Sequence, residues 1–338
     1  MDGKVTVIIP CRNEYSFIQR CLNSLINNDY PNKEVIVVDG MSNDGTRDII
    51  AEYQEKHDII KLLNNPKEIT PVALNIGLDA AEGDYIMIAG AHSWFPENYI
   101  SRMVKELNQL PDACGVGGAI VTRAGNTKVS HSIVKVMSDI FGVGNSMFRL
   151  GTRNPIRVDT IPYGLYKKET FEKVGKYDER LVRNQDIEFA KRIWKQGGKL
   201  YLVPDVVCYY QFKGNFRYLA RSNFKNGYWN ILTLYITGRV SSLSIRHFIP
   251  LTFIMALLVP LLLSLFIQCQ CLYLSLVIFL LYLAVMLIKS IQLNNKQTQL
   301  FSIFWSFMVL HFSYGFGSFL ALFKLNRLIR LEVRLDLD

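Results

Sequence analysis

The sequence contains no Asp, Glu, Lys or Arg between residues 248 and 288. One pass through a bilayer takes about 20 apolar residues, so this uncharged stretch is long enough for two membrane helices. A polar turn at residues 268–271 separates its two halves. A buried helical hairpin in a soluble core is the alternative, but an uncharged run of this length favours membrane spans.

The sequence also lacks a C-x-x-C pair and an N-terminal hydrophobic leader. Its six cysteines, at positions 11, 21, 114, 208, 269 and 271, fit a reducing compartment without disulfides. The short apolar run in MDGKVTVIIPCRNE is typical of a strand and not of a signal peptide. We therefore expect the residues that precede the uncharged stretch to stay in the cytosol.

No basic helix and no aromatic RNA-binding signature accompany the net charge of +9, so we expect no nucleic-acid partner. An anionic membrane surface explains the positive charge more simply. The residues that precede the first span are basic, as the positive-inside rule expects for a cytosolic flank. They include Arg217, Arg221, Lys225, Arg239 and Arg246.

A third apolar segment, residues 300–323, leaves the number of spans open. If this segment crosses the membrane, the basic tail of residues 325–338 lies outside, against the positive-inside rule. If it is a re-entrant or interfacial element, the tail stays inside. The sequence alone is compatible with two spans or three.

Strand-like and helix-like segments alternate through the first 120 residues. The apolar runs at 5–9, 34–39, 59–63 and 85–89 predict strands, and 16–28, 44–56 and 70–81 predict helices. This alternation predicts an α/β fold with a mostly parallel sheet and helices on both faces. Right-handed crossovers then bring residues 10–14, 39–44 and 90–92 to one edge of the sheet.

The remaining part before the membrane region is less regular. We expect strands at 114–121, 159–166, 200–203 and 206–211 and a helix at 185–196. Residues 216–236 are aromatic and basic, which is typical of a helix at a membrane interface.

Carboxylates follow the second predicted strand in VVDGMSNDGT. Asp39 stands at the strand tip and Asp44 where the next helix begins. A carboxylate at a strand tip can accept a hydrogen bond from a ribose hydroxyl or a base N–H. The alternative is local: Asp39 forms the turn and Asp44 caps the helix.

A second acidic pair begins the helix in LVRNQDIEFAKRIWKQGG. A carboxylate at this place can take a proton from an attacking hydroxyl. Asp186 and Glu188 also lie in the first helical turn, where the helix dipole favours anions. This stretch alone does not decide between a general base and a helix cap.

Together these stretches resemble one family. VTVIIPCRNE, EVIVVDGMSNDGT, the strand ending at Gly90–His92 and LVRNQDIEFAKRIWKQGG look like the inverting glycosyltransferases of family 2, which have the GT-A fold. VDTIPYGLYKKETFEKVGKYDERLVRNQDIEF and HFSYGFG resemble the succinoglycan-biosynthesis ExoA-like branch. The resemblance covers most of residues 4–247. It implies a Rossmann-like GT-A domain followed by C-terminal transmembrane helices.

The resemblance also implies roles for matching residues. Asp186 matches the general base of the family, with Gln185 in place of the Glu that usually precedes it. The expected donor-binding residues are Pro10, Arg12, Glu14, Asp39, Asp44, Gly90 and Ala91. The family's Gln-x-x-Arg-Trp motif is not present as such. Further candidates for the diphosphate or the acceptor are Arg153, Arg157, Arg221, Lys225 and Trp229.

The fourth strand departs from the family at its tip. Family members usually carry Asp-x-Asp there, whereas this sequence has Gly90, Ala91 and His92. Imidazole is a competent ligand for Mn²⁺ and less suited to Mg²⁺. We therefore expect a divalent cation, Mn²⁺ or Mg²⁺, with His92 as its ligand. The alternatives are reliance on basic side chains such as Arg153 or Arg157, and loss of catalysis, against which Asp186 argues.

The resemblance implies a complete domain plan and function. Residues 1–240 would form the cytosolic GT-A domain, with a nucleotide-binding half (1–120), an acceptor half (121–212) and an interfacial segment (213–240). Residues 246–324 would form the membrane region and 325–338 a basic tail. The enzyme would move a sugar, with inversion, from a nucleotide-diphosphate donor, expected to be a UDP-sugar, to a polyprenyl-linked saccharide. We expect a multi-pass protein of the inner or plasma membrane that acts in exopolysaccharide or capsule biosynthesis.

Other functions remain open at this point. One alternative is a polyprenyl-phosphate sugar synthase, which uses lipid phosphate itself as the acceptor. Another is a processive synthase that also exports the polymer. An alternative outside the enzymes is a non-catalytic subunit that binds a nucleotide sugar. The missing carboxylate at position 90 is the best support for it.

Overall fold

Strands and helices alternate from residue 5 onward in the computed structural model, which describes residues 3–212, 214–267 and 269–328. The strands are β1 (Val5–Cys11), β2 (Lys33–Asp39), β3 (Ile60–Asn64), β4 (Tyr85–Ile88), β5 (Ser93–Trp94), β6 (Ala113–Arg123), β7 (Ile156–Arg157), β8 (Leu165–Lys167) and β9 (Lys199–Gln211).

The helices, with two 3₁₀ turns, are α1 (Ile18–Ile26), α2 (Thr46–Lys56), α3 (Thr70–Ala80), α4 (Tyr99–Gln109), α5 (Lys128–Val136), α6 (Ile140–Val143), α7 (Met147–Leu150), α8 (Lys168–Val174), α9 (Gln185–Lys195), α10 (Phe216–Thr237), η1 (Val240–Ser242), η2 (Ile245–His247), α11 (Ile249–Phe266), α12 (Cys271–Leu293) and α13 (Leu300–Leu328).

The chain divides into two units. The first contains the described residues of Met1–Arg123 and Ser146–Gln211, and the second those of Ala124–Asn145 and Phe212–Asp338. We predicted one domain over residues 1–240, so the division differs from that plan. Its physical reason is apolar packing: Val136 on α5 is buried against Ile303 and Phe307 of α13, which joins Ala124–Asn145 to the C-terminal helices.

The sheet of the first unit has the order β3-β2-β1-β4-β8-β6-β9-β5, and β7 pairs with β9. The strands β3, β2, β1 and β4 run parallel, as the sequence predicts. β8 pairs antiparallel with both β4 and β6, whereas β6 and β9 run parallel. The sheet is therefore mixed. The predicted strand at 159–166 is reduced to β8, and β9 is continuous where we expected two strands.

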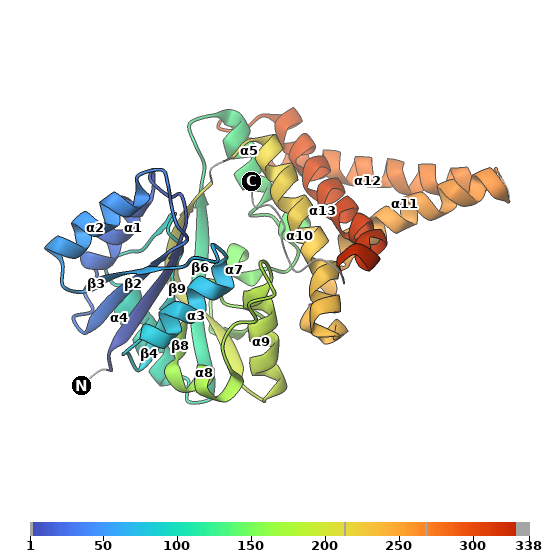
Figure 1. The fold of residues 1–338 in the computed structure, drawn as a ribbon. Helices are drawn as coiled ribbons and strands as arrows, with labels where there is room; N and C mark the ends of the chain where they lie inside the picture. The colour runs from blue at the N-terminus through green and yellow to red at the C-terminus, as the bar shows by residue number, and fades with distance from the viewer. Residues whose placement is uncertain (1–2, 213, 268, 329–338) are drawn as a thin grey trace. The chain divides into compact units, whose positions relative to one another are not determined.

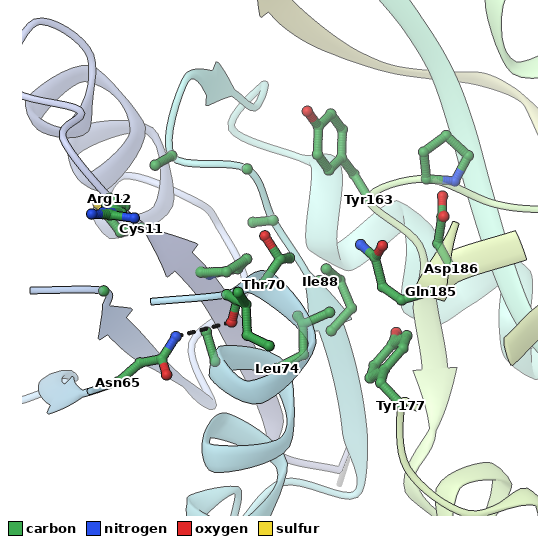
Figure 2. Close-up of a pocket in the computed structure, with 18 of the residues that line it drawn as sticks. Cys11, Arg12, Asn65, Thr70, Leu74, Ile88, Tyr163, Tyr177, Gln185 and Asp186 are labelled. Atoms are coloured by element: carbon green, nitrogen blue, oxygen red, sulfur yellow. Dashed lines mark hydrogen bonds between the residues drawn. The ribbon is translucent and has the colours of Figure 1, made fainter. Parts of the chain in front are cut away.

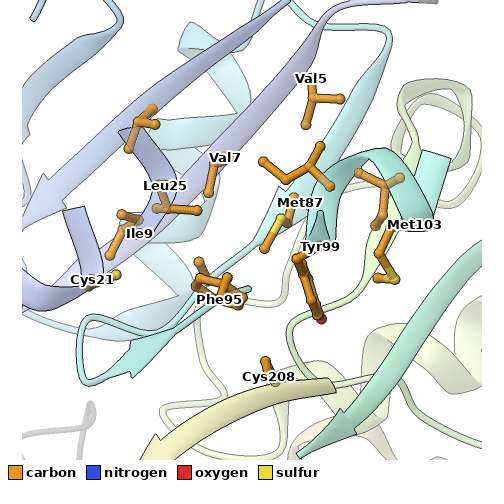
Figure 3. Close-up of a cluster of buried hydrophobic side chains, with 14 of the residues drawn as sticks. Val5, Val7, Ile9, Cys21, Leu25, Met87, Phe95, Tyr99, Met103 and Cys208 are labelled. Atoms are coloured by element: carbon orange, nitrogen blue, oxygen red, sulfur yellow. The ribbon is translucent and has the colours of Figure 1, made fainter. Parts of the chain in front are cut away.

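Alternating side chains of β1 feed two cores, one on each face of the sheet. Val5, Val7 and Ile9 pack with α1, α2 and α4, and Figure 3 shows this cluster around Tyr99. Ile8 points to the other face and packs with α3, α8 and α9. Helices on both faces explain why β1 and β2 are almost continuously apolar. Figure 1 shows both layers.

The second unit is helical. Three of its helices are long and apolar enough to cross a membrane: Ile249–Phe266, Cys271–Leu293 and Leu300–Phe323. α10 packs closely on α13 at Gly227. A Cβ on this residue would lie only 1.9 Å from the Tyr314 carbonyl oxygen, so the absence of a side chain allows the contact. Such small-residue contacts let helix backbones approach. α13 continues to Leu328, and residues 329–338 of the predicted tail lie outside the described residues.

A buried carboxylate joins the parallel strands near their amino ends. Glu34 on β2 accepts hydrogen bonds from Thr6 Oγ1, Lys61 Nζ and the backbone N–H of Glu82. Burial disfavours its ionised form, but these hydrogen bonds outweigh burial and lower the pKa of Glu34. The ionised carboxylate therefore stabilises the junction of β1, β2 and β3.

We expect Glu34→Gln to destabilise the protein by about 1–3 kcal/mol at neutral pH, because hydrogen bonds to an ionised group are lost. A carboxyl with a lowered folded-state pKa stabilises above its unfolded pKa, and this contribution fades as the pH falls. The difference in Tm should therefore shrink below about pH 4. Glu52→Gln, which breaks an exposed pair with Lys56, is the matched control and should shift Tm little. Equal Tm values for wild type and Glu34→Gln at neutral pH would contradict this account.

Candidate active site

One pocket of about 350 Å³ lies at the carboxyl ends of the parallel strands in the first unit. The loops after β1 and β4 and the start of α9 all contribute to its wall. Of the predicted site residues, the pocket brings together Pro10, Arg12, Glu14, Gly90, Ala91, His92 and Asp186. Figure 2 shows Arg12 and Asp186 on opposite sides of it.

Asp39 and Asp44 accept hydrogen bonds within the loops beside the pocket. The Asp39 carboxylate is fully buried and accepts hydrogen bonds from Ser42 and Arg47. Asp44 accepts from the backbone N–H groups of Tyr15 and Thr46, which ties the first loop to the start of α2. Gly40 lines the pocket, whereas neither aspartate does among the described residues. These contacts hold the two loops in place, and the donor-binding roles of Asp39 and Asp44 stay predictions.

Arg12 is the pocket's cationic side chain on the β1 side. Its Nη2 atom lies 2.6 Å from Glu68 Oε2, and both side chains are about two-fifths exposed. An exposed ion pair of this kind contributes little to stability. Arg12 is therefore free to exchange Glu68 for an anionic ligand at little cost.

His92 is held at the tip of β4 by two neighbours. Its Nδ1 atom lies 3.1 Å from Glu14 Oε1, and its ring meets the Tyr210 ring edge-on at 4.9 Å. Within the described residues no group of three His, Cys, Asp or Glu side chains is placed to hold a metal. One imidazole and one carboxylate nevertheless fit a cation shared with substrate phosphates, because such ions take few protein ligands.

Tyr163 occupies the space beside Gly90. A Cβ on residue 90 would lie 2.8 Å from both the Cε1 atom and the hydroxyl of Tyr163. Tyr163 itself has a φ of 53°, which is uncommon for a residue with a side chain and is found mostly where tertiary structure imposes it. Its backbone oxygen accepts a hydrogen bond from the Tyr99 hydroxyl. The glycine and the tyrosine are therefore matched to each other.

Asp186 lies in the first turn of α9, on the wall opposite Arg12. The helix dipole favours an ionised carboxylate there. Glu188 in the same turn is engaged elsewhere, since both its oxygens accept hydrogen bonds from Arg192 Nε. Arg192 also donates to the carbonyl oxygens of Val174 and Lys176, which fixes α9 beside α8. Asp186 is thus the carboxylate of this helix start that lines the pocket.

Two phenols accompany Asp186 in the pocket wall. Burial raises the pKa of Tyr166 and of Tyr177, and the negative charge of Asp186 raises both further. These tyrosines stay neutral at physiological pH and act only as hydrogen-bonding groups. Of these three side chains, Asp186 is therefore the one able to accept a proton from a substrate hydroxyl.

Comparison with known proteins identifies the chain. Residues 6–175, half of the chain, match the family described as glycosyl transferase family 2. This protein belongs to glycosyltransferase family 2. One relative is a dolichyl N-acetyl-alpha-D-glucosaminyl phosphate 3-beta-D-2,3-diacetamido-2,3-dideoxy-beta-D-glucuronosyltransferase of Methanococcus voltae. The two sequences are 31% identical over 277 residues, and the alignment covers 75% of this chain and 85% of the relative.

A second relative confirms the predicted branch. The glycosyltransferase is 29% identical over 211 residues to succinoglycan biosynthesis protein ExoA of Rhizobium meliloti (strain 1021), covering 60% of this chain and 62% of that protein. Among solved structures, mannosyltransferase PcManGT from Pyrobaculum calidifontis, in complex with GDP-Man and Mn²⁺, has a TM-score of 0.57 at 19% identity. That match covers 93% of this chain and 87% of the other, and it confirms the GT-A fold.

The other predicted residues of the glycosyltransferase lie elsewhere. The Arg157 guanidinium stacks over the Trp194 ring at 4.5 Å, and neither Arg153 nor Arg157 belongs to the described lining of the pocket. Arg221, Lys225 and Trp229 lie on α10 of the second unit, where Trp229 is buried. Their proposed contacts with diphosphate or acceptor stay predictions.

Sequence reasoning missed Tyr163, Tyr177 and Glu68, which also line the pocket. The signal for Tyr163 was its place in the turn sequence IPYG, but its partner Gly90 is far away in the chain. Glu68 has a positive φ of 60°, and no residue pattern announces that conformation.

We expect Gly90→Ala to displace Tyr163 and to reduce donor affinity and transfer by about 10- to 100-fold, because misplacement near 1 Å is costly at a reacting centre. Gly125→Ala is the control, since its nearest neighbour would lie at an ordinary 3.5 Å. If the cause is steric, adding Tyr163→Gly to Gly90→Ala recovers part of the donor affinity. Isothermal calorimetry with the donor measures the effect, and wild-type affinity in Gly90→Ala would refute it.

Proposed function

We propose that this glycosyltransferase moves a sugar, with inversion, from a nucleotide-diphosphate donor to a lipid-linked saccharide. The observation that supports the proposal is the pocket, which has the Arg12 guanidinium on one wall and the Asp186 carboxylate on the other. In this proposal Arg12 binds the anionic donor and Asp186 faces the hydroxyl of the acceptor. The same pocket therefore has a group for each reactant.

In the proposed reaction Asp186 accepts the proton of the acceptor hydroxyl while the hydroxyl oxygen attacks C1 of the donor sugar. The new bond joins C1 to the acceptor oxygen. The bond from C1 to the phosphate oxygen breaks, and its electron pair leaves with the nucleoside diphosphate. Because attack and departure occur on opposite faces of C1, the anomeric configuration inverts. Arg12 stabilises the charge on the departing diphosphate.

The proposal includes a divalent cation on the donor side of the pocket. His92 and Glu14 would hold it together with the phosphates, and the bound ion would neutralise charge on the leaving group. Imidazole favours Mn²⁺ over Mg²⁺. The proposal names a UDP-sugar as donor, and a competition series with UDP, GDP and CDP distinguishes the bases.

The acceptor proposal rests on the relatives and the helices. The Methanococcus relative is named for a dolichyl phosphate that already carries a sugar, and the Rhizobium relative for succinoglycan biosynthesis. This favours a saccharide acceptor over bare lipid phosphate. Three apolar helices would anchor the enzyme as a multi-pass protein of the plasma membrane, and its catalytic unit would lie on the cytosolic side. Exopolysaccharide or capsule assembly is the pathway class we propose.

We expect Asp186→Asn to reduce sugar transfer by at least about 100-fold while donor affinity stays within about twofold, because the amide retains the shape but not the proton-accepting charge. The measurement is nucleotide release with detergent-solubilised enzyme and a polyprenyl-linked saccharide, alongside donor binding. Glu172→Gln removes an exposed carboxylate outside the described lining of the pocket and is the matched control. Near-normal transfer by Asp186→Asn would reject Asp186 as the base.

We expect His92→Ala to raise the Mn²⁺ concentration for half-maximal activity by about tenfold or more, because one protein ligand of the shared cation is lost. A Mn²⁺ titration of transfer at saturating donor tests this. His57→Ala, on a histidine outside the described lining of the pocket, is the control. Unchanged turnover together with an unchanged Mn²⁺ midpoint would remove His92 from the metal site.

A further inference from the structure

Two arginines in the first unit contact a pair of stacked aromatic rings. Trp94 on β5 and Tyr209 on β9 are cross-strand partners whose ring centroids lie 5.4 Å apart at an angle of 18°. The guanidinium carbon of Arg20 lies 3.3 Å from the centre of the Trp94 ring. That of Arg123 lies 4.7 Å from the centre of the Tyr209 ring. We call these four residues the arginine–aromatic stack.

The described residues provide no carboxylate partner for the positive charge of this stack. Within the described residues neither Arg20 nor Arg123 forms an ion pair with a carboxylate. Both side chains are exposed. Burial lowers the pKa of Arg20, and the charge of nearby Arg123 lowers it further. The two guanidinium groups therefore repel each other across the stack, and an anion between or above them would relieve this repulsion.

The local backbone adds to the positive potential. Arg20 lies in the first turn of α1, where the helix dipole is already positive and no acidic residue is present. A cation at this position is unfavourable for the helix itself. The cation–π contact of the guanidinium with Trp94 offsets this cost. The exposed guanidinium can also donate hydrogen bonds to an anion.

The stack lies next to the pocket along the chain. His92 lines the pocket, and Trp94 follows two residues later, which corresponds to about 7 Å of extended strand. Tyr210, whose ring contacts His92, directly follows Tyr209. Tyr209 and Tyr210 point to opposite faces of β9, and β5 beside them is the last strand of the sheet. A ligand that contacts both the pocket and the stack would therefore pass around this edge.

We propose that the arginine–aromatic stack binds the phosphate of the lipid-linked acceptor, so that the first sugar of the acceptor is presented to the pocket. Guanidinium groups suit phosphate oxygens because they donate paired hydrogen bonds. The aromatic rings hold the guanidinium planes in fixed orientations. This inference rests on the proposed function, because it names the part of the same acceptor that is recognised outside the pocket.

The activity test uses Arg20→Gln and Arg123→Gln in the full-length enzyme. Each substitution should raise the KM for the lipid-linked acceptor by roughly tenfold or more, since hydrogen bonds between charged groups are lost. The KM for the donor and the slow hydrolysis of the donor by water should stay unchanged. Arg20→Lys keeps the charge and should retain part of the affinity. Arg102→Gln, on an arginine of α4 outside the stack, should behave as wild type.

A neutral acceptor separates phosphate recognition from a structural effect. On the same saccharide linked to an uncharged alkyl chain, wild type and both variants should have equal KM values. Weaker use of this neutral acceptor by the variants would overturn the proposal in favour of a structural role. Neutral detergent micelles remove anionic phospholipid from the assay. A defect that appears only in vesicles with anionic lipid would assign the stack to the membrane surface and would also overturn the proposal.

A binding measurement keeps this inference separate from the proposed transfer reaction. A short-chain polyprenyl diphosphate in neutral micelles should bind wild type at least about tenfold more tightly than Arg20→Gln/Arg123→Gln. If no donor and acceptor pair yields product but this difference is found, the reaction is wrong and the phosphate site stands. If transfer occurs and the difference is missing, the phosphate site is wrong and the reaction stands.

Discussion

The parallel pairing of β1 with β2 and β4 is the constraint on which the site depends. The register aligns Cys11 with Asp39 and Ile8 with Ile88, so the strands end at the same edge of the sheet. The backbone N–H of Ala89 continues this ladder to the carbonyl oxygen of Ile8. Loops that are far apart in the sequence therefore leave the sheet together and form one pocket, as open α/β sheets generally do.

One wall of this pocket differs from the Asp-x-Asp that the family resemblance led us to expect. A carboxylate at position 90 is sterically incompatible with Tyr163 in its present place. The change from Asp-x-Asp to Gly90–His92 is therefore coupled to a side chain from a distant segment. Glu14 supplies the carboxylate that lies beside His92. Three segments therefore form this wall together, and the carboxylate of Asp186 lies in the pocket on the side opposite Arg12.

The parallel half of the sheet could be predicted from the sequence. The strands of this half are buried on both faces, so they appear in the sequence as short apolar runs. The sequence also predicted that Arg12 and His92 follow strands, that Asp186 begins a helix, and that all three lie at one edge of the sheet. It did not predict the antiparallel β8 or the association of Ala124–Asn145 with the C-terminal helices. Both depend on contacts between distant segments, such as Val136 with Phe307, that leave no periodic pattern. The same holds for the pairing of Gly90 with Tyr163.

The central claim is that donor and acceptor meet between Arg12 and Asp186. A structure of the full-length enzyme with an intact, non-transferable analogue of the donor tests this most directly. The account predicts the diphosphate beside Arg12 and His92 and C1 of the sugar facing the Asp186 carboxylate, with room for one hydroxyl between them. A donor bound elsewhere, or a C1 atom turned away from Asp186, would contradict it.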